Sequence, residues 1–177
     1  MRDYGIVTSR LWIDENYQTL SVNSKLLFVY LLTGPHTTAL GCFRLPKSYI
    51  AADLNWPQQD VNAAIQECAS LDFLQFDESG WFFIPKFLEW NPVQNRNQWI
   101  NVKRRFDLIP ERLHFYKALL LTLNDYVRHA PAHDLKGFET LLEPFRNQEQ
   151  DQKPDPEHAC ARARETVCND MMDDEDT

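Results

Sequence analysis

Two groups of polar side chains stand out by their type and spacing. Gln58, Gln59, Asn62 and Gln66 recur within nine residues, and Lys103, Arg104 and Arg105 form the only run of three consecutive basic residues. An amide side chain both donates and accepts hydrogen bonds, which matches the edge of adenine in the DNA major groove. Lysine and arginine bind phosphate and release its counterions. The two groups together predict contact with double-stranded DNA.

The amide group lies on a segment with the apolar period of a helix. Five apolar residues occur at i, i+3, i+4, i+7 and i+10 and form one buried stripe: Val61, Ala64, Ile65, Cys68 and Leu71. This stripe leaves the four amides on or near the free side of the helix. The segment is therefore the candidate recognition helix, on which Gln58, Gln59, Asn62 and Gln66 would read base edges.

The flanking segments predict the elements that would position this helix. Residues 46–54 form a short helix, and the turn at residues 55–57 breaks it at a proline. Residues 73–77 and 81–84 form a hairpin with turn chemistry between them. Upstream, a helix capped by Ser21 ends at Gly34 and Pro35, and residues 40–45 form a strand that pairs with the hairpin. The order predicts an α+β fold containing a winged helix-turn-helix.

The expected phosphate contacts come from basic residues around this motif: Lys47, Arg96, Lys103, Arg104 and Arg105. Residues 90–99, rich in Asn and Gln and interrupted by Pro92, are expected to be a loop before the basic run. An alternative for the run is a solvated surface strand. Four acidic residues of the motif, namely Asp60, Glu67, Asp77 and Glu78, are expected to repel DNA phosphates and to keep the affinity modest.

Residues 108–130 are expected to form one long amphipathic helix. Leu113, Tyr116, Leu120, Leu123 and Val127 would line one face, which Leu119, Leu121 and Tyr126 would widen. Such a helix either packs on the preceding domain or meets its copy in a homodimer. The sequence thus divides into a winged-helix domain with a basic segment after the wing (1–107), this helix (108–130), and a flexible acidic tail (131–177).

Charge is distributed unevenly along the chain. Residues 1–130 carry 13 basic and 13 acidic side chains, whereas residues 131–177 carry 5 and 13, which accounts for the net charge of −8. Such a tail is expected to be solubilising, with competition against DNA phosphates as the alternative. The tail also contains a short apolar motif that would bind a partner protein: Phe138, Leu141, Leu142 and Phe145.

The sequence carries no motif for catalysis. It has five glycines and lacks the phosphate-loop, dinucleotide-binding, zinc-protease and serine-hydrolase patterns. The four cysteines, at positions 42, 68, 160 and 168, match no zinc spacing and are expected to be reduced thiols. With no apolar run that spans a membrane and no secretory leader, the expectation is a non-enzymatic cytoplasmic protein without cofactor or metal.

Several segments resemble a group of phage and prophage proteins with an N-terminal winged helix, usually described as replication initiators or replisome organisers. The likeness covers roughly residues 4–110 and is carried by residues 30–36, 41–46, 49–56 and 87–92. The resemblance implies binding of origin or other double-stranded DNA by the winged helix. It also implies that the C-terminal part engages a host replication protein.

Two classes of function follow from these observations. The first is a DNA-binding protein of phage or prophage type in replication initiation, or a transcription regulator in the same class. The second is a winged-helix adaptor or inhibitor that binds a protein through its neutral, aromatic-rich domain and acidic tail, which the acidic wing favours. A fold alone does not choose between them.

Overall fold

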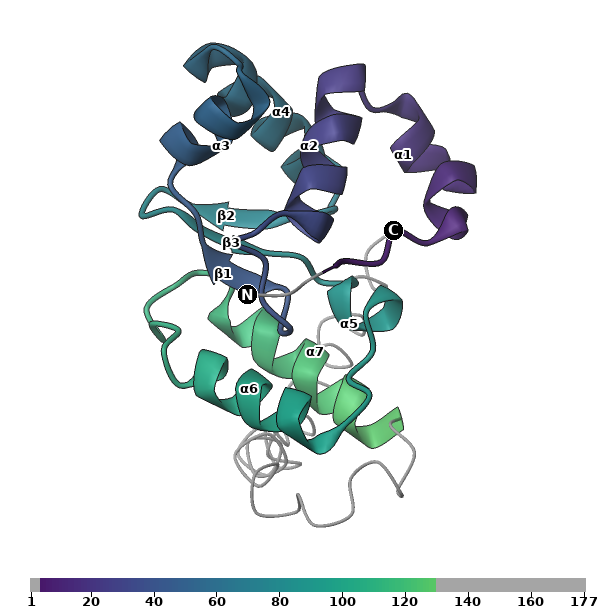
Figure 1. The fold of residues 1–177 in the computed structure, drawn as a ribbon, viewed down its shortest axis with the longest axis vertical. Coiled ribbons are helices and arrows are strands. Elements are labelled where there is room, and N and C mark those ends of the chain that lie inside the picture. Colours follow the sequence, from purple (N-terminus) through teal and green to yellow (C-terminus); the bar gives the residue numbers. More distant parts are fainter. Residues whose placement is uncertain (1–3, 130–177) are drawn as a thin grey trace, which may run out of the picture. The chain divides into compact units, whose positions relative to one another are not determined.

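The structure is a computed structural model that describes residues 4–129, all of which belong to one compact unit, Met1–Leu142. Within that range the chain is rich in helix and carries a small antiparallel sheet (Figure 1). The elements in chain order are the 3-10 helix η1 (Ser9–Ile13), α1 (Glu15–Thr19), α2 (Val22–Thr33), β1 (Cys42–Arg44), α3 (Lys47–Leu54), α4 (Gln58–Ser70), β2 (Gln75–Asp77), β3 (Trp81–Phe83), α5 (Phe87–Trp90), α6 (Arg96–Phe106) and α7 (Tyr116–His129).

Helix α2 begins and ends where its caps predict. The Ser24 backbone N–H donates to Ser21 Oγ at 3.2 Å, and the Gly34 N–H closes the last turn onto the Tyr30 carbonyl at 2.7 Å. These bonds satisfy backbone groups that a helix end otherwise leaves unpaired. The prediction of a helix between Ser21 and Gly34 is confirmed.

The turn between α3 and α4 depends on Asn55, which adopts a left-handed conformation with φ of 53°. Asparagine tolerates this region better than most residues, so it terminates α3 without large strain. The Trp56 N–H bonds the Ala51 carbonyl at 2.9 Å, and Pro57 precedes the first residue of α4. The predicted helix, tight turn and second helix are confirmed as elements.

The sheet has the strand order β1-β3-β2, with both pairs antiparallel. Phe82 is the partner of Phe43 on one side and of Phe76 on the other, so the three rings share one face of the sheet. The rings stack with centroids 6.2 and 6.3 Å apart. Phe83 points to the opposite face and stacks on Phe115 at 5.8 Å. Both faces of the sheet are therefore packed.

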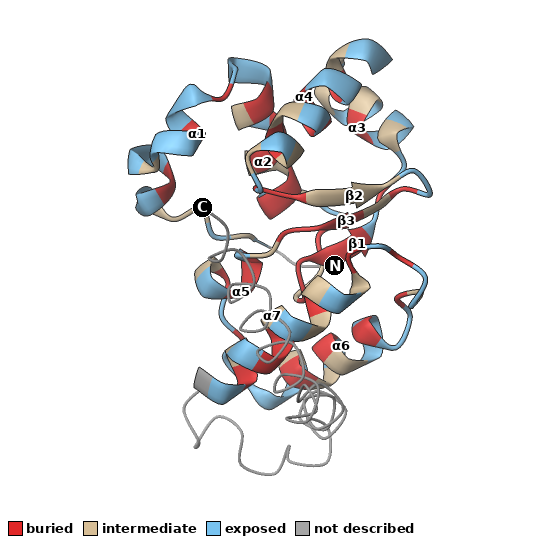
Figure 2. Cartoon of the chain, turned by 180° about the vertical axis from the view of Figure 1, so that it is seen from behind, coloured by how far each residue is buried: buried red, intermediate tan, exposed pale blue. Residues whose placement is uncertain are grey.

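Helices cover each face of the sheet. Figures 1 and 2 show α2, α3 and α4 on one side of the strands and α6 and α7 on the other. The residues coloured as buried in Figure 2 line the inner side of these layers, and Leu27, Phe28, Ile65 and Leu123 are fully buried. In the described part of the chain no helix is long and apolar enough to cross a membrane.

The prediction of a loop over residues 90–99 is wrong in part. Trp90 ends α5, and α6 begins at Arg96 with Asn95 as its cap, since the Gln98 N–H donates to Asn95 Oδ1 at 3.1 Å. Asparagine is common in loops but is also among the best helix caps. The basic run is consequently helical, and the alternative of a surface strand is wrong.

The prediction of one helix over residues 108–130 is also wrong at its start. Residues 108–115 form turns, and α7 begins at Tyr116. Pro110 explains the difference, because the residue before a proline is disfavoured in the helical region and the ring cannot continue a helix. Leu119, rather than the partly buried Leu120, joins Leu123 and Val127 in the buried face of α7.

Candidate nucleic-acid interface

The four amides of α4 lie on its solvent face. Gln58, Gln59, Asn62 and Gln66 are all exposed. Val61, Ala64, Ile65 and Cys68 are at most 2% exposed and pack inward, as the period predicts. Because α4 holds its amides on a rigid helix, they are available to hydrogen-bond a flat, polar ligand edge.

Glu67 does not belong to this exposed face. Its carboxylate accepts hydrogen bonds from the Ser21 N–H at 2.7 Å, Ser21 Oγ at 2.6 Å and Ser24 Oγ at 2.5 Å. These hydroxyl and backbone hydrogen bonds hold the pKa of Glu67 below its usual value. The carboxylate therefore caps the N-terminus of α2, where a negative charge is favourable. Because a lowered pKa keeps Glu67 ionised, the expected repulsion of DNA phosphates by its negative charge stays a prediction.

Lys47 is also engaged with other groups. Its Nζ lies 2.9 Å from Glu78 Oε2 on the hairpin and 5.2 Å from the centre of the Phe76 ring. Surface ion pairs are weak, so a phosphate can compete with Glu78 for the ammonium group. Lys47 consequently contributes less to phosphate binding than an unpaired lysine would.

The tip of the β2–β3 hairpin carries carboxylates, but basic side chains from other segments lie near it. Asp77 accepts hydrogen bonds from the backbone N–H of Ser79, at 2.8 Å, and from its hydroxyl. These bonds, with the nearby charges of His114 and Arg112, hold the pKa of Asp77 below its usual value. Arg44 Nε donates to the Ser79 carbonyl at 3.4 Å.

Sequence reasoning missed these basic neighbours of the hairpin tip. Arg112 and His114 follow Ser79 at the hairpin tip by more than 30 residues, so nothing in the local pattern links them to it. The proximity of Arg44 to the hairpin was predictable, because Arg44 ends the strand that was expected to pair with the hairpin. Three basic side chains thus join Lys47 near the hairpin tip.

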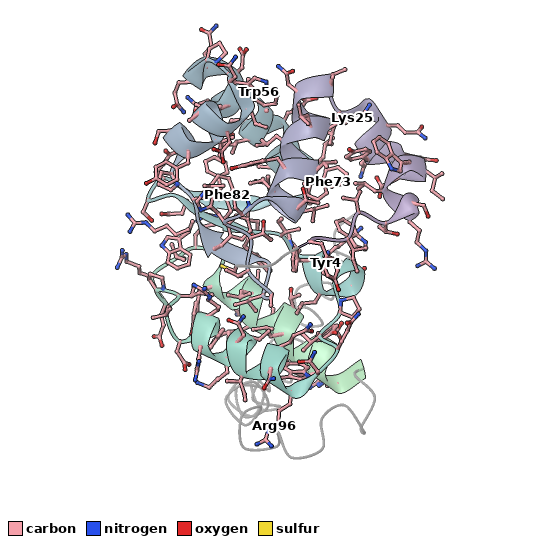
Figure 3. The ribbon with its side chains drawn as sticks, in the orientation of Figure 1. Tyr4, Lys25, Trp56, Phe73, Phe82 and Arg96 are labelled. Carbon is pink, nitrogen blue, oxygen red and sulfur yellow. The ribbon has the colours of Figure 1, made fainter. Side chains whose placement is uncertain are left out.

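The basic run occupies the C-terminal end of α6. Arg104 and Arg105 are exposed, whereas Lys103 forms an ion pair with Asp107 one turn further along. Cations are favourable at this end of a helix. Arg96 lies at the other end of α6, roughly 14 Å away along the axis at 1.5 Å per residue, and Figure 3 shows its side chain pointing away from the helices.

The structure does not bring the α4 amides and the α6 cations to one surface. The two helices lie on opposite sides of the sheet in both ribbon views. Phe76, which faces Lys47 of α3, and Phe83, which faces Phe115 just before α7, mark the two faces. The predicted residues therefore form two separate groups, one on α4 with Lys47 and one on α6.

The described residues offer little other site chemistry. Burial raises the pKa of the Cys42 and Cys68 thiols to about 12 each, so both are protonated at neutral pH. Within residues 4–129 no group of three or more His, Cys, Asp or Glu side chains is placed to hold a metal ion. The predicted partner-binding residues Phe138, Leu141, Leu142 and Phe145, and the cysteines at 160 and 168, lie outside the described residues.

Comparison of the chain with protein-family models, with curated proteins and with solved structures returned no match.

Proposed function

We propose that this protein is a DNA-binding winged-helix protein of phage or prophage type that acts in the initiation of DNA replication. The observation that carries the proposal is the order α2, β1, α3, tight turn, α4, β2 and β3, with β1 beside β3 in the sheet. In a winged helix-turn-helix, the second helix of the turn enters the major groove and the hairpin lies against the backbone. Helix α4 follows the tight turn and would take that position.

The exposed amides of α4 supply the chemistry for base reading. A glutamine or asparagine side chain makes two hydrogen bonds with adenine, and each good pair contributes about 1–3 kcal/mol of discrimination against a wrong base. Gln59 and Asn62 lie three residues apart on α4 and so share its outer face. They are the primary candidates for base contacts, with Gln58 and Gln66 beside them.

The assignment to replication rests on the resemblance of residues 4–110 to phage replication initiators and replisome organisers. Double-stranded DNA is the proposed ligand, and a host replication protein is the proposed partner of the C-terminal part. A transcription regulator would use the same α4 contacts. Selection of bound duplexes from a random pool distinguishes the two roles, because an initiator site recurs within the replicon's origin and an operator site lies at a promoter.

The proposed function is tested by titrating labelled duplex DNA at two or more salt concentrations. We expect binding at low salt that weakens as salt rises, because phosphate contacts release counterions. The Gln59→Ala and Asn62→Ala variants should relax the preference for a selected site and leave binding to random duplex unchanged. Failure of the wild-type protein to bind any duplex at low salt would contradict the proposal.

One observation favours a second candidate, a protein-binding adaptor. Residues 48–85, which contain most of α3, all of α4 and the hairpin, include six acidic residues and no lysine or arginine. The carboxylates of this segment suit a basic protein partner better than a phosphate backbone. The adaptor role predicts no duplex binding at low salt and requires binding to a purified replication protein.

A further inference from the structure

We infer that the outer face of α6 is a second DNA-binding surface, on which Asn97, Asn101, Arg104 and Arg105 contact duplex DNA. This inference rests on the proposed function and adds to it. It assigns the stronger electrostatic contact to a helix outside the winged helix-turn-helix.

Charge is the first argument. Helix α6 contains four basic residues and no acidic residue, whereas α4 contains two acidic residues and no basic residue. Affinity for duplex DNA depends mainly on the number of phosphates that lysine and arginine neutralise. Helix α4 alone cannot supply this electrostatic part of the affinity, whereas α6 can.

The second argument is the orientation of α6. Trp99, Val102 and Phe106 are 3%, 0% and 8% exposed and fix one side of the helix inward. Asn97, Asn101 and Arg104 follow at i, i+4 and i+7 on the opposite side, and all three are exposed, as is Arg105. The buried and exposed residues therefore separate into two faces, and within α6 the exposed face has no carboxylate, while the exposed Asp107 follows at the C-cap.

The third argument is hydrogen-bonding chemistry. Arginine makes bidentate contacts with phosphate oxygens or with guanine, and asparagine makes them with adenine. The partial negative charge at a helix C-terminus, roughly half an elementary charge, is smaller than the charge of Arg104 and Arg105 together. Lys103 is held by Asp107, so the two arginines are the principal cations of this end.

The packing of α6 makes this surface rigid before any ligand binds. The Trp99 ring lies 6.0 Å from that of Tyr126, and the Phe106 ring stacks on Tyr116 at 5.8 Å, so both ends of α6 are fixed to α7. Tyr126 is itself held, because its hydroxyl accepts a hydrogen bond from the Val93 N–H at 2.9 Å. A preorganised surface loses less conformational entropy on binding.

The test uses the full chain and two double variants of α6. Arg104→Ala with Arg105→Ala should reduce the slope of log affinity against log salt by about 1.8, because each phosphate contact contributes about 0.9. Asn97→Ala with Asn101→Ala should weaken binding to the selected duplex about tenfold or more and leave the slope unchanged. Asp107→Asn should strengthen binding at low salt by releasing Lys103.

Matched controls come from helices other than α6. Arg10→Ala removes an exposed arginine from η1, and Asn23→Ala removes an exposed asparagine from α2. Both should bind like the wild-type protein. Alanine is the best helix former, so the α6 variants should keep their helical circular dichroism.

The outcomes separate this inference from the proposed function. If the α6 variants bind duplex like the wild type while Gln59→Ala and Asn62→Ala lose site preference, the α6 surface is wrong and the DNA-binding function stands. If the wild-type protein does not bind duplex at low salt, both are wrong. If the α6 variants lose affinity only for single-stranded DNA, the assignment of duplex to this surface is wrong.

Discussion

At the scale of single residues, Glu67 shows how one carboxylate links two helices that are distant in sequence. It accepts three hydrogen bonds from Ser21 and Ser24, which lie more than 40 residues earlier in the chain. The Glu67 carboxylate gives the fully buried Ser24 hydroxyl a hydrogen-bond acceptor, as a buried donor requires. Helix α4 is therefore positioned against the first turn of α2 by a charged contact as well as by apolar packing.

The hydrogen bonds of Glu67 predict a pH-dependent contribution to stability. A carboxyl whose pKa is lowered by folding stabilises the protein above its unfolded pKa, about 4.3, and loses that contribution as the pH falls through the lower, folded pKa. Glu67→Ala should lower the free energy of unfolding by about 1 kcal/mol at pH 7, since hydrogen bonds to a charged group are strong but solvent weakens them here. Below the folded pKa the difference from the wild type should shrink, as urea denaturation at several pH values would measure.

The exposed Glu89 gives the control for this measurement. Glu89→Ala should change stability by less than about 0.5 kcal/mol at either pH. An equal effect of the two substitutions, or a Glu67 effect that does not depend on pH, would contradict the assigned role.

The buried thiols predict a second residue-scale result. In a variant with Cys160→Ser and Cys168→Ser, the native protein should react very slowly with a disulfide reagent at pH 8. The reason is that burial raises the pKa of Cys42 and Cys68 to about 12 and the thiolate is the reactive form. Two thiols should react after denaturation. Rapid reaction of either thiol in the folded protein would show that it is accessible.

At the scale of elements, the pairing of α6 with α7 determines what the basic segment can do. As a loop, residues 96–105 would have presented cations in no fixed arrangement. As a helix fixed by aromatic contacts to α7, they present two asparagines and two arginines on one face. The same pairing buries Leu119, Leu123 and Val127 within a single chain. That face of α7 is consequently occupied within the chain, and the homodimer given as the alternative stays a prediction.

Helix α7 is predicted to be structural. Leu123 is fully buried, so Leu123→Ala should lower the free energy of unfolding by about 2–5 kcal/mol through lost burial and the cavity left behind. Leu121, on the same helix, is 50% exposed and gives a matched leucine-to-alanine control with a change below about 0.5 kcal/mol. Guanidinium denaturation measures both. A Leu123 variant as stable as the Leu121 variant would show that α7 does not pack as described.

At the scale of the whole molecule, charge separates by layer in the described part of the chain. Residues 48–85 carry six aspartates and glutamates and no lysine or arginine. Residues 86–128 carry eight lysines and arginines and four aspartates and glutamates. These two segments contribute most of the helices on opposite sides of the sheet. A polyanion would therefore approach the α6 side first, because attraction between charges steers association.

The acidic tail predicts an effect of opposite sign on the same association. Replacing Asp173, Asp174, Glu175 and Asp176 by the corresponding amides removes four negative charges from the full chain. Affinity for duplex DNA should rise at low salt, and the difference should diminish above about 0.15 M salt, where the Debye length is about 8 Å. Anisotropy titrations at several salt concentrations test this. No change at low salt would mean that these carboxylates do not influence DNA binding.

The sequence alone determined the local elements of this protein. Ser21, Asn55, Pro57 and the turn at residues 77–80 act within a few residues of where they stand, so caps, breaks and the hairpin were predictable from short-range rules. The apolar period of α4 likewise identified its buried side. The start of α6 was not predicted, because asparagine is common both in loops and as a helix cap, as at Asn95. The start of α7 was not predicted, because the apolar period continues across Pro110.

Only the tertiary structure decided which of these elements share a surface. The contacts of Glu67 with Ser21, of Lys47 with Glu78 and of Arg44 with the hairpin join residues separated by more than 30 positions. Their proximity depends on how the whole chain packs, and no local sequence pattern indicates it. The separation of the α4 amides from the α6 cations has the same cause, because the three-stranded sheet that lies between them is completed only when β1 pairs with β3.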